Sequence, residues 1–111
     1  MVSPSAGSVV LVAFPFSDLS ASKLRPAVVL ASAGMGDWIL CQVTSNSYAD
    51  PAAVRIENSD FASGSLHRVS FARPGKLFTA NVTLLRAEVG RLNKDSLTRL
   101  LDAVVAVVRP T

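Results

Sequence analysis

The sequence predicts a mainly β domain with a C-terminal helix, built as a small, strongly bent barrel or sandwich against which the helix packs. Short apolar runs rich in valine recur along the chain, and β-branched side chains suit a pleated sheet. Turn-forming Gly, Pro, Asn and Ser residues separate most of these runs by short connections. Only the last segment changes to a repeat of three and four residues, which is typical of a helix.

Each expected strand is a short apolar or alternating run. The strands cover residues 8–14, 27–31, 38–44, 54–56, 66–71 and 84–89, with a further apolar stretch at 77–79. Pro15 ends the first strand because proline has no N–H for the ladder, and Pro26 precedes the second at a position where proline is tolerated. The turn at residues 32–37 is expected to pair the second and third strands antiparallel. Loops or turns are expected at residues 15–24, 45–51, 58–64 and 72–76.

The C-terminal helix is indicated by six apolar residues that share one face, namely Leu97, Leu100, Leu101, Val104, Val105 and Val108. Asn93 is the expected N-cap, and Asp95 suits the positive end of the helix dipole. The helix is expected to end at Arg109, before Pro110. Residues 1–6 are small and are expected to be frayed, which leaves residues 7–111 as a single domain.

The charge balance is 11 Lys and Arg residues against 8 Asp and Glu residues, a net charge of +3 that is compatible with an anionic partner. Cys41, the single cysteine, lies in an apolar run and is expected to be a buried structural thiol rather than a reactive one. A chain without an internal disulfide fits the reducing cytoplasm. No membrane partner is expected, because the apolar run at residues 9–16 is far too short to span a bilayer.

Several catalytic signatures are missing, including a Gly-rich phosphate loop, a Cys/His metal set and a nucleophile elbow. His67 is the only histidine, which excludes a ribonuclease built on two histidines. Any catalysis must therefore use Arg, Lys, Thr, Ser or Asp, and no cofactor or metal ion is expected. Such a set can cleave RNA, because the attacking 2′-hydroxyl comes with the substrate and the protein positions the phosphate, neutralises its charge and assists proton transfer.

Arg25 and Thr44 are the candidate catalytic pair. Arg25 begins one predicted strand and Thr44 ends the next, so antiparallel pairing brings both to the same edge of the sheet. A guanidinium offers two parallel donors to phosphate oxygens, and a hydroxyl adds another. The pattern alone is also compatible with a solvated arginine at a strand start and a threonine that closes a strand.

The candidate RNA-binding residues flank this pair in the sequence or lie in the turn at residues 72–76. They are Phe16, Ser17, Ser22, Lys23, Ser45, Asn46 and Arg73. Phe16 could stack on an unpaired base or belong to the core. Lys23 and Arg73 could contact phosphate or be solvated, and Ser45 with Asn46 offers small hydrogen-bonding groups.

These segments resemble the PemK/MazF family of toxin ribonucleases from bacterial toxin–antitoxin pairs, over about residues 7–108. The similarity is strongest in VLVAFPFSDLS (residues 10–20), LRPAVVL (24–30) and WILCQVTS (38–45), and weaker in KLFT (76–79) and GRL (90–92). An Arg-Pro strand start, followed at this spacing by a strand that ends in Thr-Ser, is a fairly specific pair of motifs.

The resemblance implies an SH3-like barrel with a C-terminal helix, usually a homodimer that a cognate antitoxin protein neutralises. It implies metal-independent cleavage of single-stranded RNA (mRNA or tRNA) to 2′,3′-cyclic phosphate and 5′-hydroxyl ends, with growth inhibition as the result. Arg25 and Thr44 match the family's catalytic arginine and threonine. Residues 15–24 match the loop that helps shape the RNA groove and on which antitoxins commonly act. Some members carry an acidic residue in the segment that matches residues 69–73, and here that segment is VSFAR, without a carboxylate.

Two other functions stay open. The related CcdB toxins share the fold but bind gyrase through their C-terminal residues, and residues 106–111 show no matching signature. The chain could also be a catalytically weak RNA-binding member of the fold, since the acidic residue near Arg73 is missing. The intact pair of Arg25 and Thr44 favours the ribonuclease.

Overall fold

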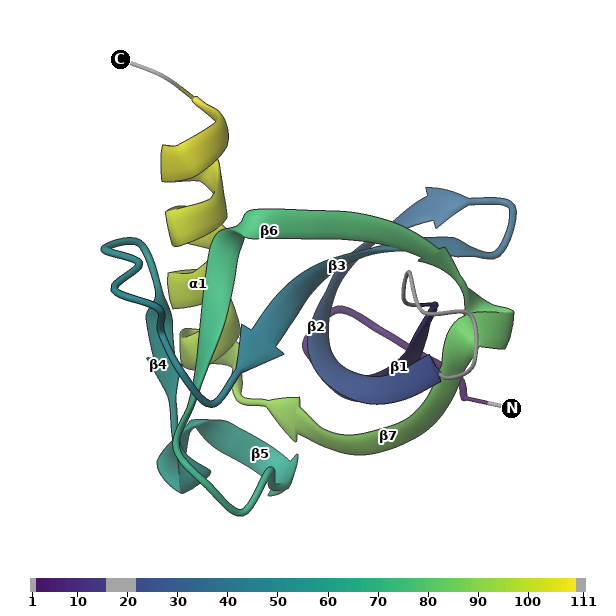
Figure 1. The fold of residues 1–111 in the computed structure, drawn as a ribbon, viewed down its shortest axis with the longest axis horizontal. Helices are drawn as coiled ribbons and strands as arrows, with labels where there is room; N and C mark the ends of the chain where they lie inside the picture. The colour runs from purple at the N-terminus through teal and green to yellow at the C-terminus, as the bar shows by residue number, and fades with distance from the viewer. Residues whose placement is uncertain (1, 16–21, 110–111) are drawn as a thin grey trace.

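The computed structural model describes residues 2–15 and 22–109, in which one curled antiparallel sheet packs against a single α-helix (Figure 1). The strands are β1 (Ser8–Pro15), β2 (Ser22–Gly34), β3 (Asp37–Thr44), β4 (Val54–Ile56), β5 (Phe61–Gly64), β6 (Ser70–Asn81) and β7 (Leu85–Leu92). Two short 3₁₀-helices, η1 (Asn58–Asp60) and η2 (Val82–Leu84), precede β5 and β7, and α1 (Lys94–Val108) ends the described fold. This architecture confirms the expected mainly β barrel with its terminal helix.

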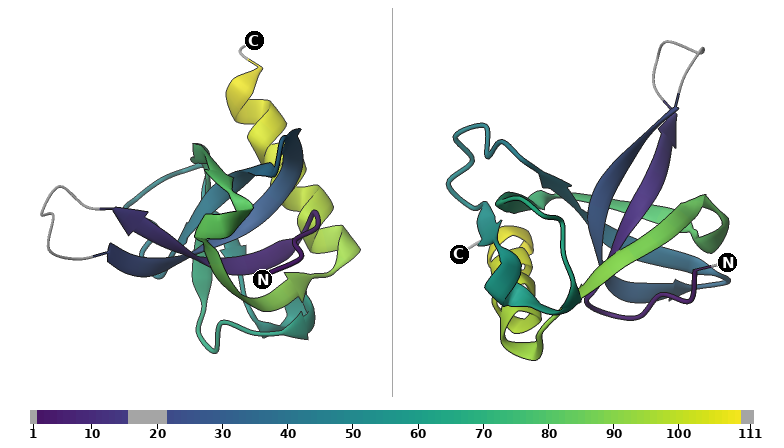
Figure 2. Two further views of the ribbon diagram at one scale, coloured as in Figure 1. Left: turned by 90° about the vertical axis from the view of Figure 1, so that its right-hand side faces the viewer. Right: turned by 90° about the horizontal axis from the view of Figure 1, so that it is seen from below.

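The sheet order is β4-β6-β3-β2-β1-β7-β5, and it curls into an open barrel (Figures 1 and 2). Register shifts interrupt the ladders that join β1 to β7, β2 to β3, β3 to β6 and β5 to β7. Such bulges bend a strand and increase its twist, which lets seven strands close around a small core.

Two apolar clusters form the core on opposite faces of this sheet. The first lies between the sheet and α1, and its buried residues are Val9, Val28, Leu30, Cys41, Val43, Ile56, Ala72, Leu92 and Leu100. The second is built from strands, and its buried residues are Val10, Val12, Ala27, Val29, Leu40, Ala80 and Leu85. Successive residues of β2 therefore enter opposite clusters, which explains why the run is apolar without alternation.

The strand β2 is longer than expected, because it begins at Ser22 and ends at Gly34. Pairing with β1 extends to Ser22 opposite Pro15, so the predicted loop at 15–24 was too long. Pro26 lies inside the strand and pairs with Leu11 of β1, whereas the ladder to β3 begins only at the next residue. Proline is tolerated there because β2 has no ladder partner on its other side at that position.

The strand β6 replaces two predicted strands and the turn between them. Residues 66–69 lie outside it, and the predicted turn at 72–76 is a bend in one continuous strand. Pro74 is fully buried in this bend, where the register against β3 shifts. The Pro-Gly pair predicted a turn because it is typical of turns. The same pair is also found at bulges within a strand, which is its place here.

The segment predicted as a loop at residues 58–64 contains η1 and β5. The strand predicted to end before Gly90 continues through it as β7. At Gly90 this strand pairs closely with β5. A Cβ at Gly90 would lie 2.7 Å from the Ser63 carbonyl oxygen and 2.8 Å from the Phe61 ring. The glycine therefore permits a close approach of two strands, which the sequence pattern does not distinguish from a turn.

The helix α1 begins as expected, since the Asn93 side chain accepts a hydrogen bond from the Ser96 amide at 2.8 Å. Leu100 is fully buried against the sheet. The sheet covers only part of the predicted apolar face, because in the last turn Val105 is 45% and Val108 61% exposed. Figure 1 shows this turn extending past the sheet, so it has no strand to cover it. Within the described residues no helix is long and apolar enough to cross a lipid bilayer.

Candidate active site

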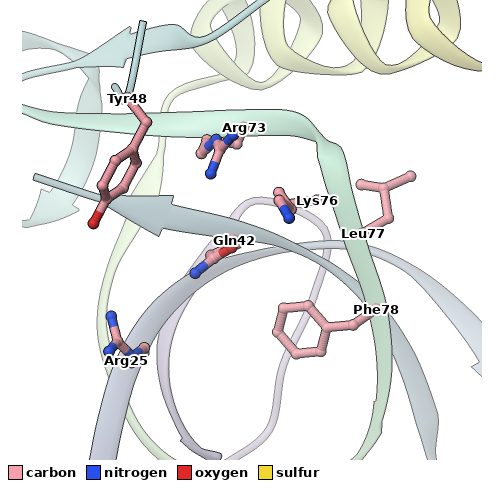
Figure 3. Close-up of a pocket in the computed structure, with 7 residues that line it drawn as sticks. All are labelled: Arg25, Gln42, Tyr48, Arg73, Lys76, Leu77 and Phe78. Atoms are coloured by element: carbon pink, nitrogen blue, oxygen red, sulfur yellow. The ribbon is translucent and has the colours of Figure 1, made fainter. Parts of the chain in front are cut away.

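Two hollows adjoin on the surface of the barrel, and Arg25 lines both of them. The first hollow, of about 480 Å³, is lined by Arg25, Gln42, Tyr48, Arg73, Lys76, Leu77 and Phe78 (Figure 3). The second, of about 380 Å³, has Lys23, Arg25, Thr44, Ser45, Tyr48 and Arg68 among its polar lining. Phe78 lines the first hollow and packs against the second core cluster, so this surface lies over the end of that cluster.

The strand register explains why Arg25 and Thr44 share the second hollow. In the ladder between β2 and β3, Ala27 pairs with Gln42 and Val28 with Cys41. The ladder ends at the pair Ala27 and Gln42, and Arg25 and Thr44 each lie two residues beyond it, at the same end of the ladder. Both side chains are half-buried. The structure thus brings together the two residues that strand pairing predicted to meet.

The loop that follows Thr44 is ordered by its own polar side chains. The Thr44 hydroxyl accepts a hydrogen bond from the Asn46 amide at 3.2 Å, and Asn46 Oδ1 accepts one from the Tyr48 amide at 2.8 Å. Asp50 Oδ1 accepts one from the Ala52 amide at 2.9 Å. In each case the acceptor is two residues before the donor, the pattern by which Thr, Asn and Asp stabilise turns. Since its oxygen accepts here, the Thr44 hydroxyl keeps its proton for another partner.

Arg73 is held by two residues of this loop. Its Nε lies 3.1 Å from Asp50 Oδ2, and the two side chains are only 20% and 15% exposed. Its guanidinium carbon lies 5.4 Å from the centroid of the Tyr48 ring. The Ala52 amide, and after it the Arg73 guanidinium, hold the pKa of Asp50 below its ordinary value, so this carboxylate is charged at neutral pH.

Asp50 supplies a carboxylate near the site that the sequence did not predict. The segment at 69–73 has none, as the sequence shows, but Asp50 reaches Arg73 from a loop 23 residues earlier. Tyr48, Gln42 and Arg68 were also missed. For Tyr48 a signal existed, because it is the one aromatic residue in the polar segment at 45–51.

The charged side chains that line the two hollows are all cationic. Five cationic residues line them, namely Lys23, Arg25, Arg68, Arg73 and Lys76. Among the described residues, neither lining includes an Asp or Glu. A concave surface with this lining attracts anions and focuses their approach. The arrangement can hold a phosphodiester with a guanidinium and a hydroxyl on its oxygens.

The other predicted site residues fall into three groups. Lys23 and Ser45 line the second hollow, and Arg73 the first. Asn46 lies beside them in the loop, with its oxygen bonded to the Tyr48 amide. Ser22 starts β2, while Phe16 and Ser17 lie outside the described residues.

Other groups in the fold lack the features of a reactive centre. Burial raises the pKa of the Cys41 thiol to about 12, and the thiol donates to the Arg73 carbonyl oxygen at 3.1 Å. The prediction of a buried structural thiol is confirmed. Across residues 2–15 and 22–109, no three His, Cys, Asp or Glu side chains converge as a metal ion would require.

Residues 5–108 match the family described as PemK-like, MazF-like toxin of type II toxin-antitoxin system. No curated protein matches the chain. Among solved structures, the chain is similar to one in the MazE–MazF crystal structure (Form-II) from Deinococcus radiodurans, with a TM-score of 0.76, 20% identity and 97% of each chain covered. An endoribonuclease in complex with its cognate antitoxin from a mycobacterial species gives a TM-score of 0.73 at 16% identity, covering 98% of this chain and 99% of that one. The toxin MazF-mt6 from Mycobacterium tuberculosis gives 0.72 at 14% identity, covering 94% and 98%. These likenesses show a shared fold.

Proposed function

Because the chain belongs to the PemK-like and MazF-like toxins of type II toxin–antitoxin systems, we propose that it is an endoribonuclease that cleaves single-stranded RNA without a metal ion. The observation that carries this proposal is the meeting of Arg25 and Thr44 in a hollow lined by cations. Both residues also match the positions expected from the family motifs.

In the proposed reaction the RNA supplies its own nucleophile. The 2′-oxygen forms a bond to phosphorus while the bond from phosphorus to the 5′-oxygen breaks. The 2′-hydroxyl loses its proton, and the leaving 5′-oxygen gains one. The products are a 2′,3′-cyclic phosphate and a 5′-hydroxyl end, with no water consumed.

Arg25 and Thr44 would act on the charge that develops in this step. The guanidinium of Arg25 donates two N–H groups to the non-bridging oxygens, which become more negative in the transition state. The Thr44 hydroxyl donates a further hydrogen bond. Removing one such donor costs about 3 kcal/mol, or about a hundredfold in rate.

The cationic side chains around the pair would guide the RNA backbone. Lys23 and Arg68 line one hollow and Arg73 with Lys76 the other, so positive charge extends on both sides of Arg25. A single strand could thus bind with its scissile phosphate at Arg25 and flanking phosphates on either side. We assign Ser45 and Asn46 to this groove, and we keep Phe16, Ser17 and Ser22 as residues predicted from the sequence to contact RNA.

We further propose that the protein acts in the cytoplasm as a homodimer and is neutralised by a cognate antitoxin. Two of the fold relatives come from solved structures described as MazE–MazF and as an endoribonuclease in complex with its cognate antitoxin. An antitoxin with acidic side chains would suit the cationic hollows.

The decisive experiment is incubation of the purified protein with a defined RNA in excess EDTA, followed by mapping of the ends. Cleavage that continues in EDTA and leaves ends that polynucleotide kinase can label directly supports the proposal. Cleavage that strictly requires magnesium overturns it. Intact RNA together with inhibition of gyrase supercoiling would instead indicate a CcdB-like toxin.

A further inference from the structure

We propose that Tyr48 is the residue on which a base next to the scissile phosphate stacks, and that Arg73 and Asp50 position its ring. This inference rests on the proposed ribonuclease function and names a specificity-determining residue for the same site.

The first observation is the place of Tyr48 in the groove. Among the described residues, only Arg25 and Tyr48 line both hollows. A nucleotide whose phosphate is held at Arg25 therefore has its base within reach of the Tyr48 ring. Figure 3 shows the Tyr48 ring at the end of β3, with Arg73 to its right and Gln42 and Arg25 below it.

The second observation is that the ring is exposed. Tyr48 is 60% exposed, whereas Trp38 and Phe78 are partly buried against the second core cluster. An exposed aromatic ring contributes little to folding, but it offers a flat apolar surface to a ligand. Base stacking on such a ring is the usual way in which proteins hold unpaired RNA.

The third observation is that the ring is held in place before any ligand binds. The Tyr48 amide is bonded to Asn46, and its φ of 52° lies in the left-handed region, which is costly for a tyrosine. The Arg73 guanidinium lies over the ring, and Asp50 fixes that guanidinium through the bond at 3.1 Å. A ring that is already oriented loses less conformational entropy when a ligand binds. The strained backbone of Tyr48 and the fixed orientation of its ring are therefore both consistent with a binding role.

The test compares Tyr48→Leu with Tyr48→Phe in RNA cleavage. Leucine removes the aromatic face, whereas phenylalanine keeps it and loses only the hydroxyl. We expect Tyr48→Leu to raise KM about tenfold with kcat within about threefold of the parent, because stacking acts mainly in binding. Tyr48→Phe should match the parent. An unchanged KM for Tyr48→Leu overturns the inference.

A spectroscopic experiment reports on the stack itself. Tyr48 is the only tyrosine in the chain, so incorporated 3-fluorotyrosine gives a single ¹⁹F resonance. The ligand is an RNA with a 2′-deoxy nucleotide at the cleavage position, which removes the attacking hydroxyl and prevents turnover. We expect this RNA to shift the resonance, and the same RNA with an abasic site beside the scissile phosphate to leave it nearly unshifted. Equal shifts with both RNAs contradict the inference.

Asp50→Asn tests the positioning role, because asparagine keeps the acceptor for the Ala52 amide and removes the charge that holds Arg73. We expect a smaller rise in KM than with Tyr48→Leu and a broader ¹⁹F resonance. A narrow, unshifted resonance and an unchanged KM contradict the positioning role.

The outcomes separate this inference from the proposed function. If the unmodified protein cleaves no RNA in EDTA, the proposed function fails. If it cleaves RNA and Tyr48→Leu does so equally well, only the inference fails. If Tyr48→Leu weakens antitoxin binding while KM for RNA stays constant, the ring is a protein contact and the inference is wrong.

Discussion

Arg25 on β2 and Thr44 on β3 line the same hollow, because each lies two residues beyond the pair Ala27 and Gln42, at which the ladder between the two strands ends. Arg25 also lines the neighbouring hollow with Arg73 and Lys76. One guanidinium therefore stands where two cationic depressions join, which is the place that a bound phosphodiester would occupy.

Arg25→Ala should lower kcat for RNA cleavage about a hundredfold or more, because the guanidinium donates to oxygens that gain charge in the transition state. Arg25→Lys should recover only part of the rate, since an ammonium cannot donate two parallel bonds. Cleavage of a defined RNA measures both effects. The control is Arg55→Ala, which removes an exposed arginine paired with Glu57 on another face. Circular dichroism should show the same fold in all three variants, and a full-rate Arg25→Ala protein would contradict the assignment.

Thr44→Val should lower the rate about tenfold to a hundredfold, because valine keeps the shape and removes the hydroxyl, which is both the donor to phosphate and the acceptor for the Asn46 amide. Thr44→Ser retains a hydroxyl and should stay close to the parent. If Thr44 and Arg25 act on the same phosphate, the double variant should lose less than the product of the two single losses. Strictly multiplicative losses would indicate that the two residues act independently.

Cys41 should react very slowly with thiol reagents in the folded protein, because its pKa is raised to about 12.

The raised pKa of Cys41 also makes the stability of the fold depend on pH. The pKa of Cys41 in the folded protein lies above the ordinary value of 9.0. The protonated thiol therefore contributes its full share to the free energy of unfolding below pH 9, and this contribution is lost as the pH rises further. Urea unfolding should show a loss of about 1 kcal/mol between pH 9 and pH 10 that Cys41→Ala lacks. An identical alkaline profile for both proteins would contradict this prediction.

Asp60 should stabilise the junction between η1 and α1. Desolvation alone would raise the pKa of this carboxyl, but hydrogen bonds from the Glu57 amide and from α1 outweigh it and hold the pKa below its ordinary value. The partners on α1 are the Ser96 hydroxyl at 2.7 Å and the Arg99 guanidinium at 3.0 Å. Asp60→Asn should therefore lower the free energy of unfolding by about 1–2 kcal/mol at pH 7.

The pH dependence of the free energy of unfolding provides a control for the prediction on Asp60→Asn. A depressed folded pKa means that the stabilisation is present above the ordinary value of 3.8 and is lost as the pH falls below it. The parent and Asp60→Asn should thus converge in stability toward acid pH, as measured by urea unfolding. RNA cleavage by Asp60→Asn at pH 7 should be unchanged, because this junction lies outside both hollows.

The sequence by itself determined the features that depend on near neighbours. Apolar runs bounded by turn residues located the cores of β1, β2 and β3, and the repeat of three and four residues with Asn93 before it located the start of α1. The single turn between β2 and β3 was enough to predict that Arg25 and Thr44 meet. The short turn fixes that the two strands are adjacent and antiparallel, whereas two register shifts between the turn and Ala27 decide which residues face each other.

Only the tertiary structure decided what depends on distant segments. Residues 70–81 form one bent strand because β3 and β4 pair along it, and Val108 is exposed because no strand extends beneath it. The contact of Tyr48 and Asp50 with Arg73 arises because the loop after β3 folds over β6, which lies beside β3 in the sheet. Neither the spacing nor the composition of the chain contains that adjacency, since it is set by the order in which the strands pair.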